Sequence, residues 1–452
     1  MNNETVKAAE LANLHPNASG FTASTSYRYY AVGILFVVYG LNYLDRQILS
    51  ILMEPIKKEF TFSDMQLGLL GGFAFAALYT TLGIVIARFA DRYNRVTIIS
   101  ISMIVWSIFT AVTGKAQGFW TLFAARVGVG IGEAGCNPPA YSIISDYFEL
   151  KRRATMLSIY SLGVYLGQFL GYQVVHQVEP ILGWRYAFYV VGAPGILLAI
   201  VLKLTLREPP RGFSEPTGYI PTEPPPVMQV LRKLAAKPAF RNLSLAAGLH
   251  ALVAYGLNNF YSSFLQRSHH MTVSEAAYAL SFITLIGGLT GTYLGGWLSD
   301  KFASRNNGDP RYQLWVPAIA LIINTPIWLL ALTLPDRYTV YALFTAAILF
   351  GATYLGPSIS STHQLVGVRE RALGGAMLLF VLNIIGLGMG PVLSGFISDK
   401  IAISLIADGM DKTQALADGL KYALCIMAMA NLWSAYHYFR GAKTLREDIA
   451  KG

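Results

Sequence analysis

The segment FWTLFAARVGVGIGEAGCNPPAYSIISDYF, residues 119–148, decides the fold. It is long and apolar enough to cross a bilayer, although it contains Arg126 and Glu133. Ionisable residues inside a membrane span are costly and are typical of functional positions. Pro138 and Pro139 remove backbone hydrogen-bond donors, so we expect the helix to bend there.

The same segment has a polar face and a glycine face. At 100° per residue, four residues fall within an arc of about 60°: Arg126, Gly130, Glu133 and Asn137. The opposite side carries Gly128, Gly132, Gly135 and Pro139. Because small residues let a second helix approach closely, the glycine face predicts a helix contact. The charged face must then point to a protein interior or a water-filled cavity.

The composition places the whole chain in the same class. Of its 452 residues, 54% are hydrophobic and only 13% are charged, which indicates a polytopic helical membrane protein. The first 26 residues are polar and lack the apolar region of a signal peptide, so we expect insertion to begin with the first span. Cys136 and Cys425 both lie in apolar segments, which argues against a disulfide framework or a metal site.

Windows of about 19 residues predict twelve spans. They begin near Tyr29, Asp64, Val96, Phe119, Ala154, Arg185, Asn242, Thr272, Leu314, Tyr338, Ala372 and Asp418. The longest interruption carries eight prolines and is too polar to span. We therefore expect a cytoplasmic tail (1–27), a six-helix bundle (28–206), a cytoplasmic linker (207–241) with a surface helix at Val227–Ala236, a second bundle (242–440) and a cytoplasmic tail (441–452).

The distribution of charge predicts the topology. Most of the 35 basic residues fall in segments that are cytoplasmic if the N-terminus is inside. The positive-inside rule therefore puts both termini in the cytoplasm of a cell inner membrane. The net charge of +10 needs no nucleic-acid partner to explain it.

The two predicted bundles look like copies of one unit. The motif Ala87-xxx-Asp91-Arg92 after the second span corresponds to Gly296-xxx-Asp300-Lys301 after the eighth. Arg153-Ala154, before the fifth span, corresponds to Arg371-Ala372, before the eleventh. Internal repeats of this kind are common in secondary transporters.

At these residues the chain resembles the major facilitator superfamily, whose loop signature is similar to Asp91-Arg92-Tyr93-Asn94-Arg95, with Ala87 and Asn94 at positions where glycines are usual. A narrower resemblance is to the Spinster family of lipid transporters. It rests on Asn42-Tyr43-Leu44-Asp45-Arg46, on Gly83–Arg95, on Arg126–Ala134 and on Arg207-Glu208-Pro209-Pro210-Arg211-Gly212. The resemblance implies twelve helices in two pseudo-symmetric bundles, with helices 1, 4, 7 and 10 lining a central cavity. It covers the N-terminal half in motif and the C-terminal half mainly in topology.

Three buried charges are predicted to meet. Counted at about 1.5 Å per residue from the outer ends of their spans, Asp45 lies about 15 Å deep, Arg126 about 12 Å and Glu133 about 22 Å. Arg46 is rotated by 100° from Asp45 and must find another partner or extend toward water. We expect Asp45 and Glu133 to carry the coupling proton, and protonation to release Arg126 for a phosphate or carboxylate of the substrate. A permanent ion pair that fixes spans 1 and 4 is the alternative interpretation.

The C-terminal half has no buried acid or base at the corresponding places. Expected substrate-binding residues are therefore Arg46, Arg126, Asn137, His250, Tyr255, Asn258, Asn259 and Tyr354. This asymmetry favours an amphipathic substrate whose charged head contacts the N-terminal half. Lysolipid or sphingoid-phosphate substrates are what the resemblance implies. For His250, a hydrogen-bonded histidine inside the bundle is the alternative interpretation.

A second group of charges lies at the cytoplasmic ends of the spans. We interpret it as a cytoplasmic gate, because alternating access requires an interaction that closes one face and can break. Its members are Asp91, Arg92, Arg95, Asp146, Arg153 and Asp300. Asp146, Arg153 and Asp91 are expected to form an inter-helix network.

The sequence therefore predicts a monomeric, proton-coupled transporter of an amphipathic, lysolipid-like substrate, surrounded by membrane lipids. A transporter of small organic anions or drugs shares every coupling feature, and a passive scramblase would need no proton carboxylate. No nucleophile with a base and no metal-ligand cluster is visible, so we expect neither an enzyme nor a cofactor.

Overall fold

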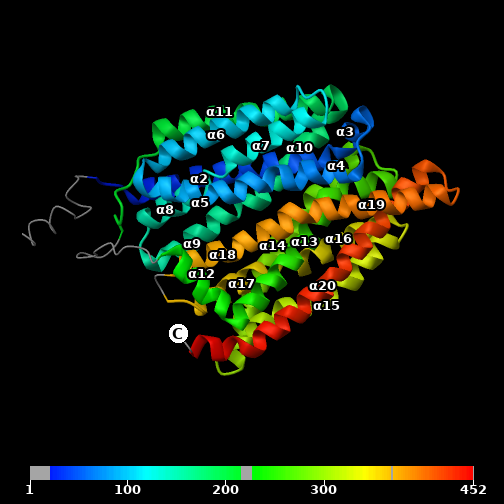
Figure 1. The fold of residues 1–452 in the computed structure, drawn as a ribbon. Coiled ribbons are helices and arrows are strands. Elements are labelled where there is room, and N and C mark those ends of the chain that lie inside the picture. Colours follow the sequence, from blue (N-terminus) through cyan, green and yellow to red (C-terminus); the bar gives the residue numbers. More distant parts are fainter. Residues whose placement is uncertain (1–20, 215–225, 368–369, 451–452) are drawn as a thin grey trace, which may run out of the picture.

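The computed structural model describes residues 21–214, 226–367 and 370–450 of the 452-residue chain. Within these ranges the regular structure is helical, with no β-strand. Two groups of long helices lie beside each other, one from the N-terminal half of the chain and one from the C-terminal half (Figure 1). The fold is the expected all-α membrane architecture.

The N-terminal half contains spans 1 to 6. Span 1 is α2 (Thr25–Ile51), followed by the short α3 (Met53–Phe60). Span 2 is α4 (Asp64–Gly68), the π-helical turn η2 (Leu69–Phe73) and α5 (Ala74–Arg92), and span 3 is α6 (Arg95–Thr113). Span 4 is α7 (Phe119–Glu133) and α8 (Asn137–Tyr147), span 5 is α9 (Leu150–Ser161) and α10 (Gly163–Leu182), and span 6 is α11 (Trp184–Thr205).

The C-terminal half repeats this order after the surface helix α12 (Val227–Ala236). Spans 7, 8 and 9 are α13 (Pro238–Ser268), α14 (Val273–Arg305) and α15 (Arg311–Thr333). Span 10 is α16 (Arg337–Ala352) and α17 (Leu355–Gln364). Span 11 is α18 (Arg371–Leu382), the π-helical segment η4 (Asn383–Met389) and α19 (Gly390–Ala407), and span 12 is α20 (Lys412–Ala450).

The predicted and observed starts of the spans differ by at most six residues, the largest difference being Lys412 against the expected Asp418. α12 covers the segment expected to be a surface helix. At the C-terminus, α20 continues to Ala450, and Leu445 is buried against the second bundle. The residues assigned to a C-terminal tail therefore form part of the last helix as far as Ala450.

Within the described residues, eight helical stretches are long and apolar enough to cross a membrane, judged by length and composition alone. They correspond to spans 2, 3, 6, 8, 9, 10, 11 and 12. Spans 1, 4, 5 and 7 fall short because polar residues or helix breaks interrupt them. Three of these four spans carry the candidate charges and amides.

Span 4 is interrupted after Glu133, as its prolines predicted. α7 ends at Glu133, a turn covers residues 134–136, and α8 begins at Asn137. Pro138 and Pro139 have no N–H to bond the carbonyls one turn earlier, so the helical ladder cannot continue through this point. The interruption lies directly beside the buried Glu133.

The glycine face of span 4 packs on span 3. A Cβ atom on Gly132 would lie 2.5 Å from the backbone nitrogen of Trp106, and one on Gly135 would overlap the Ser102 hydroxyl. Only glycine allows so close an approach. The contact fixes the rotation of α7, which directs Arg126 and Glu133 away from span 3 and into the bundle.

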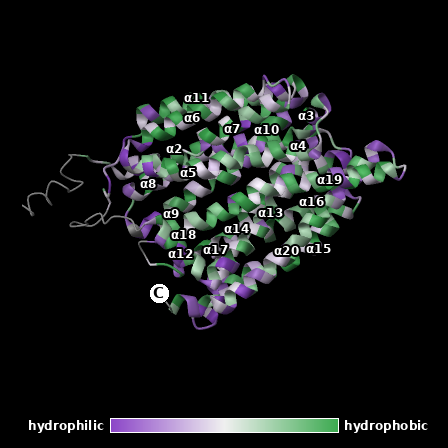
Figure 2. Cartoon of the chain, in the orientation of Figure 1, coloured by the Kyte–Doolittle hydropathy of each residue, from purple (hydrophilic) through white to green (hydrophobic). Residues whose placement is uncertain are grey.

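The bundle has two polar ends and an apolar middle (Figure 2). One end, called here the basic end, is formed by residues 88–95, 146–153, 203–214 and 301–311. The other, called the opposite end, is formed by residues 52–66, 114–118, 267–273 and 333–338. The basic end lies on the side of α8, α9 and α12 in Figure 1, and the opposite end on the side of α3 and α19. The candidate charges of spans 1 and 4 lie between the two ends.

Candidate functional site

An ion pair joins spans 1 and 4. Nε of Arg46 donates to Oε2 of Glu133 at 2.5 Å. The Glu133 side chain is fully buried, whereas that of Arg46 retains 13% exposure. A carboxylate so deeply buried requires a cation or a proton, because an unpaired charge in an apolar interior costs several kcal/mol.

Aromatic rings enclose the Arg46 guanidinium. Its carbon lies 4.9 Å from the ring centre of Tyr43, 4.8 Å from that of Phe75 and 4.4 Å from that of Tyr79. Such cation–π contacts stabilise a guanidinium by about 0.5–2 kcal/mol each, depending on desolvation. The rings come from α2 and α5, so spans 1, 2 and 4 together build the site.

Arg126 also lies near the Phe75 ring, with its guanidinium carbon 5.6 Å from the ring centre. Its side chain is almost completely buried, and its Nε has no hydrogen-bond partner in the described residues. It interacts electrostatically with Glu133 and with Asp45, whose Oδ1 is also without a partner. The site therefore holds two carboxylates and two guanidinium groups but a single ion pair.

This pairing corrects one expectation. The sequence predicted Arg126 as the partner of the acids and another partner, or water, for Arg46, whereas Glu133 is bonded to Arg46. The helical period gives the 100° between Asp45 and Arg46 but not the rotation of span 1 about its axis. In the structure that rotation turns Arg46 toward spans 2 and 4.

Asn137 is held within the N-terminal half. Its Oδ1 accepts from the Tyr160 hydroxyl at 2.7 Å, and its Nδ2 donates to the Tyr79 hydroxyl at 3.3 Å. Tyr160 in turn stacks on Tyr39, with ring centres 4.4 Å apart. Asn137 thus orders the aromatic wall beside Arg46.

His250, in span 7, lies in a buried polar cluster of the C-terminal half. Its Nδ1 is 2.8 Å from Oδ1 of Asn431 and its Nε2 is 3.0 Å from the carbonyl of Gly351. Asn431 donates onward to Asn324 at 3.0 Å. Both ring nitrogens are engaged, which favours the interpretation of His250 as a hydrogen-bonded histidine inside the bundle.

Two tyrosines of the C-terminal half lie toward the centre of the molecule. The ring of Tyr354 meets that of His250 edge to face, with centres 4.5 Å apart. Tyr255 packs against the hydrophobic clusters of both halves. Together they offer an apolar and aromatic surface without a charge.

Asn258 and Asn259 have a different position from the other candidates. Oδ1 of Asn258 accepts from Gln47 at 3.2 Å, and Nδ2 of Asn259 donates to the sulfur of Met53 at 3.3 Å. Both contacts cross from one half to the other. These amides therefore help to join span 7 to span 1 and to the short helix α3 that follows it.

The opposite end is closed by a network that sequence reasoning missed. Nη2 of Arg267, in span 7, donates to Glu54 at 2.6 Å and to Asp64 at 2.7 Å. Asp64 also accepts from Lys57 at 2.5 Å and from the Ser398 hydroxyl at 2.6 Å. Residues from both halves thus form a buried cluster of charges.

At the basic end the expected gate residues lie mostly within one half. Arg95 is fully buried and donates to Asp146, to Glu208 at 2.6 Å and to the Ser142 hydroxyl at 2.7 Å. Asp146 is therefore bonded to Arg95, whereas the network expected of Asp146, Arg153 and Asp91 includes a side chain outside the described residues. This cluster ties spans 3 and 4 to the start of the linker.

The remaining gate candidates lie in different surroundings. Arg153 donates to the carbonyl of Phe148 at 3.4 Å and to Ser214 at 3.5 Å. Arg92 and Asp300 are exposed, and the Asp91 side chain lies outside the described residues. At this end α8 and α9 pack mainly against N-terminal helices, and α17 and α18 mainly against C-terminal ones. The halves therefore meet at the opposite end and part toward the basic end.

Comparison with known proteins agrees with this architecture. The profile of the Major Facilitator Superfamily matches residues 35–391. An MFS-type efflux pump of Mycolicibacterium smegmatis is 31% identical over 419 residues, 93% of this chain and 94% of that protein. Protein spinster homolog 3 of Danio rerio is 27% identical over 423 residues, 88% of this chain and 83% of that protein.

A solved structure is similar over almost the whole chain. It is the crystal structure of a bacterial homologue of the human lysosomal transporter Spinster in an inward-facing and unoccupied conformation. The TM-score is 0.87 and the sequence identity 35%, covering 94% of this chain and 99% of the other.

Proposed function

Because this chain belongs to the major facilitator superfamily, and within it to the Spinster family, we propose that it is a proton-coupled transporter of a lysolipid-like or sphingoid-phosphate-like substrate. The protein is a membrane transporter and not an enzyme. The observation that carries the proposal is the buried Arg46–Glu133 ion pair beside Arg126, whose Nε has no hydrogen-bond partner in the described residues.

Protonation of Glu133 is the coupling step. A neutral Glu133 no longer holds Arg46, and an anionic head group can take its place on the guanidinium. Loss of the substrate then leaves Arg46 free to attract the ionised Glu133 again. Asp45, whose Oδ1 has no hydrogen-bond partner in the part of the chain that the structure describes, is the second site on which a proton can reside.

The two arginines suit an anionic head group. Arg46 and Arg126 both lie over or near the Phe75 ring, and Arg126 has hydrogen-bonding capacity that no described residue uses. A phosphate accepts several charge-assisted hydrogen bonds and can contact both guanidinium groups. Tyr255 and Tyr354 supply the apolar surface that an attached hydrocarbon chain requires.

The arrangement of the halves supports an inward-facing state. With the basic end in the cytoplasm of an inner membrane, as the positive-inside rule predicts, the Arg267 network closes the outer face. The site between spans 1, 2 and 4 is then approached from the cytoplasm. The outward-facing state requires the Arg267 network to break and the basic ends to come together, where Arg153 and Asp300 are candidates to close the gate.

A second candidate function is the export of small organic anions or drugs. It is favoured by the similarity to an efflux pump over 93% of the chain. Such a substrate would need the two arginines but not the apolar surface of Tyr255 and Tyr354. A passive scramblase is the third possibility, and its flux would not depend on a pH gradient.

The proposal is tested by uptake into proteoliposomes that contain the purified protein. The substrates are a lysophospholipid, a sphingoid phosphate and a soluble organic anion, each with and without an imposed pH gradient. We expect the lipids to be transported and the gradient to accelerate transport. Glu133→Gln should still bind the lipid but should no longer respond to the gradient.

Each other result points to a different function. If only the soluble anion is transported and the gradient still accelerates transport, the protein is a proton-coupled transporter of organic anions. If lipid flux through the wild-type protein does not depend on the pH gradient, the protein is a passive scramblase. The matched control is Glu179→Gln, since Glu179 lies near the opposite end of span 5, away from the ion pair.

A further inference from the structure

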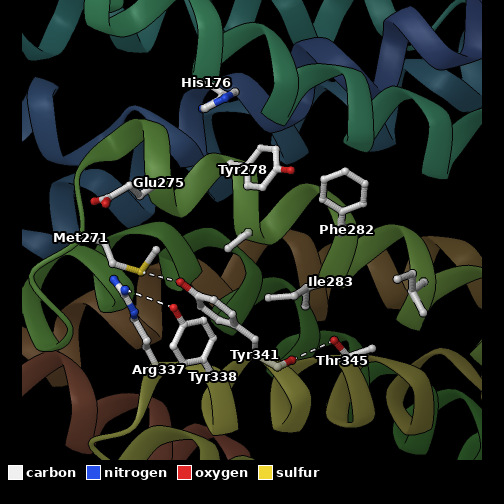
Figure 3. A pocket seen from close by; sticks show the side chains of 12 residues that line it. His176, Met271, Glu275, Tyr278, Phe282, Ile283, Arg337, Tyr338, Tyr341 and Thr345 are labelled. Carbon is white, nitrogen blue, oxygen red and sulfur yellow. Dashed lines mark hydrogen bonds between the residues drawn. The ribbon is translucent and has the colours of Figure 1, made fainter.

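A groove on the flank of the molecule lies away from the Arg46–Glu133 ion pair. It has a volume of about 480 Å³ and is lined by residues of spans 5, 8 and 10 (Figure 3). Tyr278, Phe282 and Ile286 form one wall, at helical spacing along α14, and are 50%, 40% and 53% exposed. Tyr341 and Thr345 of α16 form the facing wall.

The groove has charges at one end only. Glu275 and Arg337 lie at the first turns of α14 and α16, at the opposite end of the bundle. Their charges act on each other, but in the described residues they form no ion pair. Glu275 uses Oε2 to cap its own helix at Thr272, and Arg337 makes one bond, to the Tyr338 hydroxyl at 3.3 Å. A cation and an anion with free bonding capacity therefore lie at the same end of an apolar groove.

The depth of the groove matches one leaflet of a bilayer. From Glu275 to Ile286 the helix rises by about 16 Å, at about 1.5 Å per residue. Half of a hydrocarbon core of about 30 Å is about 15 Å. An acyl chain that begins beside the charges would end near the midplane of the membrane.

From this geometry we propose that the groove binds a zwitterionic phospholipid of the outer leaflet. Its phosphate contacts Arg337, its ammonium group contacts Glu275, and one acyl chain lies between the Phe282 and Tyr341 walls. The complementary order of charges favours a head group of the ethanolamine type over an anionic one.

The site also depends on the conformation of the protein. His176 belongs to span 5 of the N-terminal half, lines the groove, and contacts the Ser274 hydroxyl of the C-terminal half at 2.7 Å. Opening of the opposite end separates spans 5 and 8 and takes His176 away from the two walls, which both belong to the C-terminal half. A ligand that binds one arrangement better than the other stabilises it, so this lipid favours the inward-facing state.

The test uses the full-length protein in nanodiscs with phosphatidylethanolamine that carries a photoactivatable diazirine in one acyl chain. Cross-linked peptides are then mapped by mass spectrometry. We expect labelling of residues 273–286 and 337–345 to be about fivefold stronger with this lipid than with the phosphatidylglycerol analogue. Arg337→Gln should reduce this labelling about fivefold, and Glu275→Gln should remove the preference for ethanolamine while keeping the helix cap.

Lys412→Gln is the matched control, because Lys412 is an exposed cation at the same end but outside the groove. It should label like the wild type. Equal labelling with the two lipids, even labelling of all lipid-facing helices, or no effect of Arg337→Gln would overturn the proposal. Displacement of the probe by a transported lysolipid but not by unlabelled phosphatidylethanolamine would also overturn it, since the groove would then belong to the transport path.

Discussion

The carboxylate of Asp399, in span 11, accepts hydrogen bonds from the backbone N–H groups of Asp64 and Met65, at 2.9 and 2.8 Å. The first turn of span 2 is therefore capped by a side chain of the other half. Free N–H groups at a helix start carry partial positive charge, which a carboxylate stabilises. This contact and the Arg267 cluster hold the opposite end closed.

Loss of the Asp399 cap should favour opening of that end. We expect Asp399→Ala to destabilise the closed state by about 1 kcal/mol and to raise the open population about fivefold. The measurement is the rate at which an impermeant maleimide modifies a cysteine placed at Ser262, which is buried at this interface, in a chain lacking Cys136 and Cys425. Lys400→Gln, at the neighbouring exposed position, should leave the rate unchanged.

Arg267 should be needed chiefly to compensate two buried acids. The side chains of Arg267, Glu54 and Asp64 are 9%, 7% and 0% exposed. Arg267→Met leaves both carboxylates without their main cation and should lower the free energy of unfolding by about 3–5 kcal/mol. Adding Glu54→Gln and Asp64→Asn should recover most of the loss in thermal unfolding of the purified protein. Strictly additive losses would mean that the cluster is not an energetic unit.

The two arginines of the candidate site should behave in opposite ways toward stability. Arg46→Met removes the partner of the buried Glu133 and should destabilise the protein by several kcal/mol. Arg126→Met removes a buried cation that has no ion-pair partner within 4 Å in the described residues and should be neutral or stabilising. Both variants should lose lipid transport. The check is thermal unfolding and proteoliposome uptake on the same preparations, and equal destabilisation by both substitutions would contradict the assignment.

Much of this fold could be predicted because it follows from local patterns. The twelve spans follow from hydropathy, a close helix contact on one face of span 4 from its glycine spacing, and the break after Glu133 from two adjacent prolines. The burial of Asp45, Arg126 and Glu133 was also predictable, since each lies far from the ends of an apolar span.

The partners of those charges could not be predicted, because they depend on how distant helices are rotated and tilted. Asp45 and Arg46 are neighbours in sequence, and only the rotation of span 1 decides which of them faces Glu133. The cluster of Glu54, Asp64 and Arg267 at the opposite end could not be predicted either, since each of these residues is typical of the charges found at the end of a span. Their meeting is visible only when both halves are assembled.

Arg95 should be a structural residue of the basic end. Its guanidinium is buried, contacts Asp146 and Glu208, and donates to the carbonyl of Pro209 at 2.7 Å. Lysine cannot reproduce this planar set of bonds, so Arg95→Lys should lower the free energy of unfolding by about 2–4 kcal/mol. Arg92→Lys, at an exposed position, should change it by less than about 0.5 kcal/mol. Unfolding in increasing denaturant measures both, and an Arg95→Lys variant as stable as the wild type would refute the role.

Attachment of the surface helix α12 should weaken in acid. Nζ of Lys233 donates to Glu370 at 3.0 Å, and this hydrogen bond lowers the pKa of Glu370 from its usual value. A lowered pKa means that the ionised form is favoured in the folded state, so the stabilisation is complete above about pH 5 and is lost as the pH falls below about 4. Both side chains are partly exposed, at 34% and 17%, so the contribution is less than about 1 kcal/mol. A spin label at the exposed Met228 should become more mobile between pH 7 and about pH 3.5, while Glu370→Gln should give the same mobility at both values because no charge is lost. A label whose mobility changes equally in the two proteins would show that another group controls the attachment of α12.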